Sequence, residues 1–105
     1  MKIVFTSKGP GWEDEIDPRF GRTSYILVFD DGSQGLEPID NRSIDEEAHG
    51  AGPKTAKKVL DIGPDVMITG NGPGGNAGQV LEKSGMKIFT GAGKMKVIEA
   101  YKAFQ

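Results

Sequence analysis

Residues 25–41 read YILVFDDGSQGLEPIDN. Positions 25–29 are all apolar, which is typical of a strand that is covered on both faces of a sheet. The Asp-Gly pair at 31–32 is a turn signal, after which residues 35–41 are expected to return as a second strand beside the first. Pro38 has no N–H to donate, so this returning strand is expected at a sheet edge. The stretch therefore predicts an antiparallel hairpin.

The sequence on either side of the hairpin predicts one more strand and a helix. Residues 2–7 contain a short apolar run and form a first strand. From residue 48 to residue 62, apolar residues recur at helical spacing with lysines on the opposite side, which indicates an amphipathic helix. Asp45 or Glu46 is expected to cap its start, and Gly63 is expected to end it.

The second half of the chain has the order strand, helix, strand, helix. Strands are predicted at 66–69 and 87–89, and helices around 77–84 and 94–104. An antiparallel hairpin followed by right-handed crossovers gives a mixed five-stranded sheet with helices on both faces. We expect a ribonuclease H-like three-layer α/β fold. A flavodoxin-like sheet is the alternative, but its wholly parallel order conflicts with the hairpin.

Length and composition set limits on the class of protein. A chain of 105 residues fits a single domain over 1–105, and 36% hydrophobic with 27% charged residues is ordinary for a globular protein. The formal charge of -2 argues against a general nucleic-acid binder. No apolar run approaches the roughly 18 residues that a membrane helix needs, so we expect a cytoplasmic protein without a membrane role. The absence of cysteine excludes disulfides, zinc fingers and thiolate-held iron–sulfur sites.

A sixteen-residue loop precedes the hairpin and contains DPRFGR at residues 17–22. Loops of this length in small domains are usually functional or disordered. Arg19 and Arg22 carry planar five-donor groups that suit carboxylates, phosphates or an anionic cluster. The alternative is that Arg19 forms a surface ion pair with Asp17 or Glu15.

His49, the only histidine, and Gly50 after it stand at the start of the first predicted helix, and both are candidate cofactor contacts. Imidazole is a versatile metal ligand, and the N–H groups of a helix start favour nearby anions. A metal held by this chain alone would lack a second strong nitrogen or sulfur ligand, whereas a preassembled cluster that brings its own sulfides needs fewer. The alternative is a structural or merely exposed histidine.

A glycine-rich loop, GNGPGGNAG at 70–78, connects a predicted strand to a predicted helix. Glycines there let backbone amides approach a ligand, and the helix start favours phosphate or another anion. The candidate contacts are Gly70, Asn71, Gly72, Gly74 and Gly75. The loop is neither a Walker A motif nor a dinucleotide fingerprint. The alternative is a tight turn without a ligand.

Catalytic patterns are missing. A ribonuclease H-like nuclease needs carboxylates on its central strands to hold two metal ions, and residues 2–7 carry none. His49 has no recognisable nucleophile partner. We therefore expect a binding protein rather than an enzyme, and a hydrolase or nuclease is the weakest of the alternatives.

These motifs, in this order, resemble the dinitrogenase iron-molybdenum cofactor-binding family, which includes nitrogenase cofactor carriers and small stand-alone proteins. The matching pieces are 17–22 ahead of 25–30, the HGAGP stretch at 49–53, 66–70 with Gly-Pro at 72–73, and 81–89. The likeness covers almost the entire chain. The phenylalanine-glycine and histidine-glycine-alanine motifs at this spacing carry it.

The resemblance implies a ribonuclease H-like fold and a role in carrying an anionic metal–sulfur cofactor, iron-molybdenum or related, or its precursor. It implies His49 as the metal ligand, with Arg19, Arg22 and the backbone of the 70–78 loop as anion contacts. Some carriers have histidine where this chain has Arg19, so direct metal ligation from that loop is not expected here. A donor or acceptor protein for the cofactor would be the partner.

A regulatory or scaffold domain is the alternative function. It would recognise a protein partner or a small phosphorylated ligand through the same loops. Its best feature is Trp12, because an exposed tryptophan favours interfaces. The alternative for Trp12 is a local packing anchor.

Overall fold

The computed structural model describes residues 1–46 and 50–104, apart from the side chains of Asp45, Glu46 and Asn76. The elements in chain order are β1 (Lys2–Ser7), β2 (Tyr25–Asp30), β3 (Gly35–Asp40), the short 3-10 helix η1 (Arg42–Glu46), α1 (Ala51–Ile62), β4 (Val66–Ile68), α2 (Gly75–Lys83), β5 (Lys87–Phe89) and α3 (Val97–Phe104). Within the described ranges, none of the helices has the length and apolar character needed to cross a membrane.

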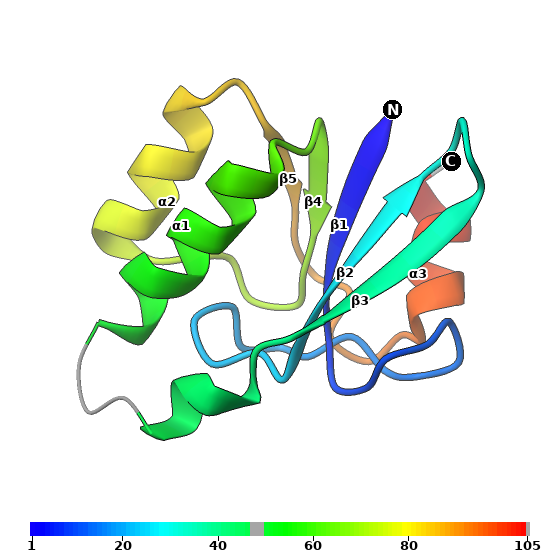
Figure 1. Ribbon diagram of the computed structural model, residues 1–105, viewed down its shortest axis with the longest axis horizontal. Coiled ribbons are helices and arrows are strands. Elements are labelled where there is room, and N and C mark those ends of the chain that lie inside the picture. The colour runs from blue at the N-terminus through cyan, green and yellow to red at the C-terminus, as the bar shows by residue number, and fades with distance from the viewer. Residues whose placement is uncertain (47–49, 105) are drawn as a thin grey trace.

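One mixed sheet organises these elements in the order β3-β2-β1-β4-β5. The predicted hairpin is confirmed, because β2 pairs antiparallel with both β1 and β3. The later strands are parallel, with β4 between β1 and β5. Helices α1 and α2 cover one face of the sheet and α3 covers the other (Figure 1). The expected ribonuclease H-like α/β fold is confirmed.

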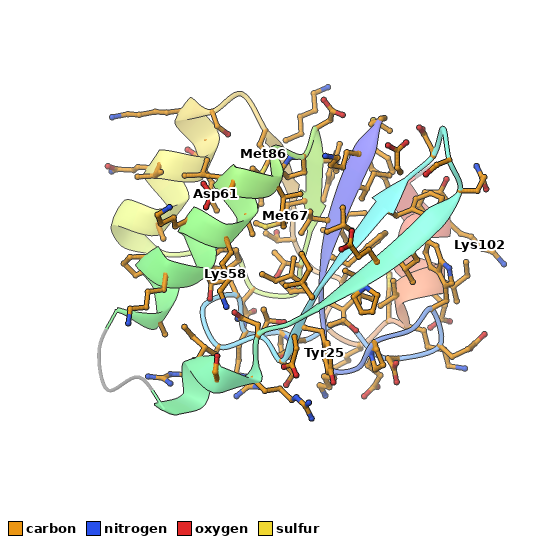
Figure 2. All side chains as sticks on the ribbon, in the orientation of Figure 1. Tyr25, Lys58, Asp61, Met67, Met86 and Lys102 are labelled. Carbon is orange, nitrogen blue, oxygen red and sulfur yellow. The ribbon has the colours of Figure 1, made fainter. Side chains whose placement is uncertain are left out.

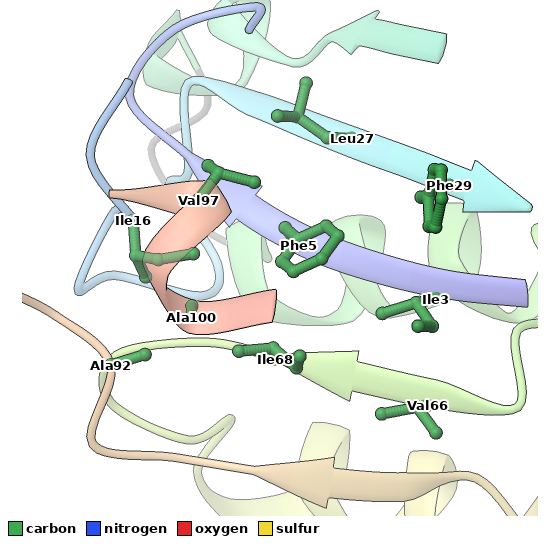
Figure 3. Packing of buried hydrophobic residues seen from close by; sticks show 10 residues of the cluster. All are labelled: Ile3, Phe5, Ile16, Leu27, Phe29, Val66, Ile68, Ala92, Val97 and Ala100. Atoms are coloured by element: carbon green, nitrogen blue, oxygen red, sulfur yellow. The ribbon is translucent and has the colours of Figure 1, made fainter. Parts of the chain in front are cut away.

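Two apolar clusters pack against the opposite faces of the sheet. Central strand β1 contributes to both, since Ile3 and Phe5 face α3 whereas Val4 faces α1 and α2, and all three are fully buried. Figure 3 shows Phe5 and Ile68 beneath Val97 and Ala100 of α3. Strands buried on both sides read as continuous apolar runs, which is why β1 and β2 were recognisable.

The start of α1 differs from the prediction. The helix begins at Ala51 behind Gly50, which adopts a left-handed conformation with φ 80°, and neither Asp45 nor Glu46 caps it. Those two acidic residues end η1 instead. The predicted stop is confirmed, because the Gly63 N–H donates to the Val59 and Leu60 carbonyls.

Helix α3 also starts later than expected, at Val97 rather than near residue 94. The reason is a contact with the long loop. Ile16 N–H donates to the Met95 carbonyl at 2.9 Å, and Lys96 forms an isolated bridge with Glu15. These pairings tie residues 95–96 to the long loop, and the helix begins directly after them.

Candidate functional site

Four connections meet at one end of the sheet, which we call the rim: residues 17–24, 50–53, 69–75 and 90–93. The long loop after β1, the start of α1 and the connections after β4 and β5 all lie at this end in Figure 1. The carboxyl ends of the three parallel strands point the same way. In open α/β sheets, ligands bind outside these strand ends.

Asp17 is the centre of the first rim loop, and its side chain is fully buried. Its carboxylate accepts hydrogen bonds from the backbone N–H groups of Arg19 and Ser24, at 3.0 and 3.1 Å. The Arg19 guanidinium donates to both carboxylate oxygens at 3.1 Å. The Asp17 backbone also pairs with Thr6 in both directions. One buried carboxylate therefore fixes the path of the loop.

The pKa of the Asp17 carboxyl lies below its ordinary value despite burial. Burial alone would raise this pKa, because it disfavours the charged form. The hydrogen bonds from the Arg19 side chain, the Arg19 and Ser24 N–H groups, and the charge of Arg19 outweigh that effect. The carboxylate is ionised at neutral pH and holds Arg19 in a fixed orientation.

The two arginines of the loop have different neighbours. Arg19 pairs with Asp17, as the alternative anticipated, but the carboxylate is buried while the Arg19 side chain is 53% exposed. Arg22 donates from Nη1 to the Ile44 carbonyl of η1 at 3.2 Å. Between them, Phe20 is buried in the core beneath α1 and α2. The loop is thus anchored by an aromatic side chain and presents cationic groups on either side of it.

Glycines allow the rim segments to touch. A Cβ atom on Gly21 would lie 3.0 Å from the Gly52 backbone in α1, and one on Gly70 would lie 2.5 Å from the Pro18 Cα. The Asn71 N–H donates to the Pro18 carbonyl at 2.8 Å. The loop at 17–22, the start of α1 and the loop after β4 are therefore in direct backbone contact. The Asn71 N–H is used by this contact.

Helices α1 and α2 begin side by side at the rim, behind Gly50 and Gly74, which have no side chain to cap them. A Cβ on Gly52 would lie 4.0 Å from the Ala77 Cβ, so the two first turns are neighbours. The first N–H groups of a helix lack intrahelical acceptors and carry about half a positive charge together. Gly75 is the first residue of α2. The arrangement favours an anion.

Gly72, another candidate of the glycine loop, lies against Thr90 in the connection after β5. A Cβ atom on Gly72 would be 3.1 Å from the Thr90 methyl group. This connection closes the rim on its far side. The Gly91 N–H donates to the Gly70 carbonyl at 2.8 Å. Sequence reasoning missed residues 90–93, although glycines at 91 and 93 directly after a strand repeat the signal at 70–75.

A buried polar network behind the rim was also missed. The Asn41 side-chain amide donates to the Thr23 carbonyl and to Thr55 Oγ1. The Lys58 ammonium donates to Asn41 Oδ1. Thr55 Oγ1 donates in turn to the Gly21 carbonyl at 2.6 Å. The network joins the end of β3, helix α1 and the loop at 17–24. A single asparagine after a strand gives no sequence signal of this role.

His49 lies outside the described residues, so its role stays a prediction. Trp12 is not an exposed interface residue: its ring packs edge-on against Phe5 and Phe29, with centroids 5.9 and 5.1 Å away, and against Tyr101. Trp12 is a packing anchor, which removes the main support for the scaffold alternative.

The described ranges 1–46 and 50–104 contain no group of three or more His, Cys, Asp or Glu side chains placed to hold a metal ion. The rim instead offers N–H groups and guanidinium groups, which are hydrogen-bond donors. Such donors suit an anion whose metals already have ligands of their own.

The sequence model of the dinitrogenase iron-molybdenum cofactor family matches residues 1–105. Two solved structures are similar along nearly the whole chain. The apo form of the orange protein from Desulfovibrio gigas has a TM-score of 0.89 and 33% identity, over 98% of this chain and 85% of that chain. A NifB-like protein of the DUF35 family from Thermotoga has a TM-score of 0.80 and 30% identity, over the same shares of 98% and 85%.

A third structure, PH0822, has a TM-score of 0.77 at 20% identity, over 99% of this chain and 88% of that chain, and shows the fold alone. No curated protein matches the chain. The chain belongs to the dinitrogenase iron-molybdenum cofactor family.

Proposed function

We propose that this member of the dinitrogenase iron-molybdenum cofactor family binds and carries an anionic metal–sulfur cluster at the rim, without a reaction of its own. The cargo would be an iron-molybdenum cofactor, a related cluster or a precursor. The proposal includes a cytoplasmic carrier of one domain that exchanges its cargo with a donor or acceptor protein, and not with nucleic acid or a membrane.

The observation that carries the proposal is the pair of helix starts. Helices α1 and α2 begin next to each other, directly after Gly50 and Gly74, and these two cap residues have no side chain that could accept from the first N–H groups. The loop at 17–22 contacts the same spot through Gly21. Helix starts and guanidinium groups both favour negative charge. Their convergence supports an anion as the ligand.

The donor set also fits a cluster better than a bare metal ion. The chain has no cysteine, and its described part has no multi-residue metal-binding group. A cluster that is already ligated by sulfide needs hydrogen bonds to its sulfurs more than it needs protein ligands. His49 would add one nitrogen ligand, and Arg22 with the amides of Gly74 and Gly75 would contact the anionic surface.

Anaerobic titration of the full chain with an iron-molybdenum or molybdenum-copper sulfide cluster tests this function. Saturable binding should appear as a charge-transfer absorption band. Arg22→Gln and His49→Ala should each weaken binding by about tenfold, as expected for the loss of one charge-assisted contact or ligand. Lys102→Gln is the matched control, since Lys102 is exposed on α3, on the opposite face of the sheet from α1 and α2 (Figure 2).

The control should bind within about twofold of the unchanged protein, because surface charge outside the rim contributes little. Equally poor binding by the unchanged protein and by both rim variants would remove the proposed function. Equal and tight binding by all of them would move the site away from the rim.

A further inference from the structure

An apolar pocket of about 180 Å³ lies between β5 and α3. Phe89 and Phe104 form one wall, with ring centroids 5.1 Å apart. Met95 forms another, and Ile68 with Ala92 line the inner end. Phe89 is 43% exposed and Met95 is 36% exposed, which is high for large apolar side chains. Exposed apolar surface of this kind often marks an interaction site.

The pocket adjoins an open strand. Strand β5 is the last in the sheet and pairs only with β4. The parallel register places Phe89 beside Ile68 and Lys87 beside Val66, so both β5 side chains lie on the α3 face with the pocket. An extended segment can add to such an edge by main-chain hydrogen bonds and place alternate side chains in pockets.

The charges around this edge identify the chemistry of the partner. None of the described residues that line the pocket is acidic. Lys87 and Lys94 are exposed, and within the described part of the chain neither forms an ion pair, whereas Lys8, Lys57 and Lys96 do. We propose that the outer edge of β5 and the adjacent pocket dock an extended acidic segment of a partner protein, with one large apolar side chain seated in the pocket.

A second copy of this chain fits the edge less well. A two-fold contact would place the same surface of each copy against the other, bringing the exposed lysines of both copies together. Lysine on an edge strand is a known means of preventing such pairing. The same lysines attract an acidic strand, so the charge pattern selects a partner of opposite charge.

The docking surface reaches the rim. Thr90, Gly91 and Ala92 line the pocket on one side. On the other side, Gly91 and Ala92 donate to the carbonyls of Gly70 and Thr69, at 2.8 and 3.3 Å. A docked segment would therefore contact the connection that holds the glycine loop. The docked partner could then exchange cargo with the rim. This role in exchange rests on the proposed carrier function. Docking itself is measured without cargo.

Selection from an unbiased displayed library of peptides of about twelve residues tests the docking, with the full chain as the bait. Selected peptides should share one large apolar residue within two positions of Asp or Glu, the spacing at which strand side chains share a face. In NMR titrations they should shift the signals of residues 87–95 and 100–104. Binding should weaken as salt rises, because the lysines are exposed.

Three variants separate the parts of the surface. Ala103→Gln narrows the pocket and should weaken peptide binding by about tenfold, and Lys87→Glu should weaken it by about fivefold through charge. Lys102→Glu, a charge reversal on the same helix but outside the pocket lining, should change it by less than about twofold. Circular dichroism confirms that each variant is folded.

The inference is wrong if selection yields no binder, if the peptides are basic or map elsewhere, or if the chain self-associates through this edge in sedimentation experiments. Ala103→Gln should leave cluster binding unchanged. Loss of docking with intact cluster binding would overturn this inference alone, and the reverse result would overturn the carrier function alone.

Discussion

Two aspartates in this chain hold an arginine two residues further on, at 17–19 and at 40–42. In both pairs the arginine backbone N–H donates to the aspartate Oδ1, at 3.0 and 2.9 Å. The guanidinium Nη2 donates to Oδ2 in both, at 3.1 and 2.7 Å. The Asp17 side chain is fully buried, whereas the Asp40 side chain is 52% exposed. The local geometry is the same and the surroundings differ.

The difference shows that burial, rather than the motif, gives the pair its role. Asp17 also receives the Ser24 N–H, and its backbone pairs with Thr6, so losing it would release a whole loop. Within the described residues, Arg42 donates hydrogen bonds to the Asp40 carboxylate and also stacks over the Tyr25 ring at 5.3 Å. Exposed pairs of this kind contribute little to stability.

Replacing each of the two aspartates should give the largest difference in stability between the two pairs. Asp17→Ala removes a fully buried carboxylate that accepts from the Arg19 and Ser24 N–H groups and from the Arg19 guanidinium, so we expect a loss of about 2–4 kcal/mol in the free energy of unfolding. Asp40→Ala, the matched control, should lower Tm by less than about 3 °C. Chemical and thermal unfolding measure both. Equal losses from the two variants would contradict the account.

The buried network beside Asp40 provides the next test. Asn41→Ala removes the donor to the Thr23 carbonyl and the acceptor of Lys58, and we expect a loss of about 1–3 kcal/mol. Asn41 lies directly between Asp40 and Arg42 in the sequence. Its replacement should nevertheless lower the free energy of unfolding to an extent closer to that of Asp17→Ala than to that of Asp40→Ala. Urea unfolding measures it. An effect as small as that of Asp40→Ala would show that this network does not support the rim.

Backbone contact distinguishes the rim in a second way. A Cβ on Gly70 would lie 2.5 Å from the Pro18 Cα, while one on Gly35, in the hairpin, would meet only the Ser33 hydroxyl at 3.5 Å. Gly70→Ala should therefore cost about 1–2 kcal/mol through forced displacement of the loop, and Gly35→Ala less than about 0.5 kcal/mol. Cluster affinity should fall in the first variant alone. A stable Gly70→Ala protein with normal affinity would contradict the tight contact.

Changes in pH and salt concentration should produce the smallest differences between the two aspartate–arginine pairs. The pKa of Asp40 is lowered to about 2 by its hydrogen bonds to Arg42, and the pKa of Asp17 is lowered against the opposing effect of burial. Each ionised group therefore contributes stability above the ordinary carboxyl pKa of about 3.9, and loses it as pH falls through the lower folded-state value.

Carboxyl carbon shifts in NMR titrations measure both groups. At 1 M salt, where the screening length is about 3 Å, the pKa of exposed Asp40 should rise towards its ordinary value. The pKa of buried Asp17 should move less, because screening hardly reaches it. A larger rise in the pKa of Asp17 than in that of Asp40 would contradict the conclusion that Asp17 is the buried member of the two.

Most of the fold could be predicted because its signals are local. The apolar runs of β1 and β2, the hairpin turn and the stop at Gly63 each depend on a few neighbouring residues. The start of α1 and the start of α3 could not be predicted in the same way. The cap position of α1 is Gly50 rather than an acidic residue, and residues 95–96 are held by a loop about 80 residues earlier.

The sequence predicted which segments form the candidate site, but it did not predict the buried hydrogen bonds that hold those segments in place. The motif at 17–22 was identified because it lies in a long loop and carries two arginines, and the motif at 70–78 because its glycines connect a predicted strand to a predicted helix. The burial of Asp17 could not be read from its sequence, since Asp40 precedes an arginine at the same spacing and is exposed. The contacts of Asn41 and Thr55 join residues 14 positions apart, a separation that no local pattern encodes.

Backbone amide NMR during titration with a molybdenum-copper sulfide cluster tests the central claim most directly. The account predicts that shifts concentrate at residues 19–22, 50–52 and 72–75, around the two helix starts, while residues 31–35 and 63–65 at the opposite end of the sheet stay unchanged. Shifts centred on that opposite end, or spread evenly over the surface, would contradict an anion site at the rim.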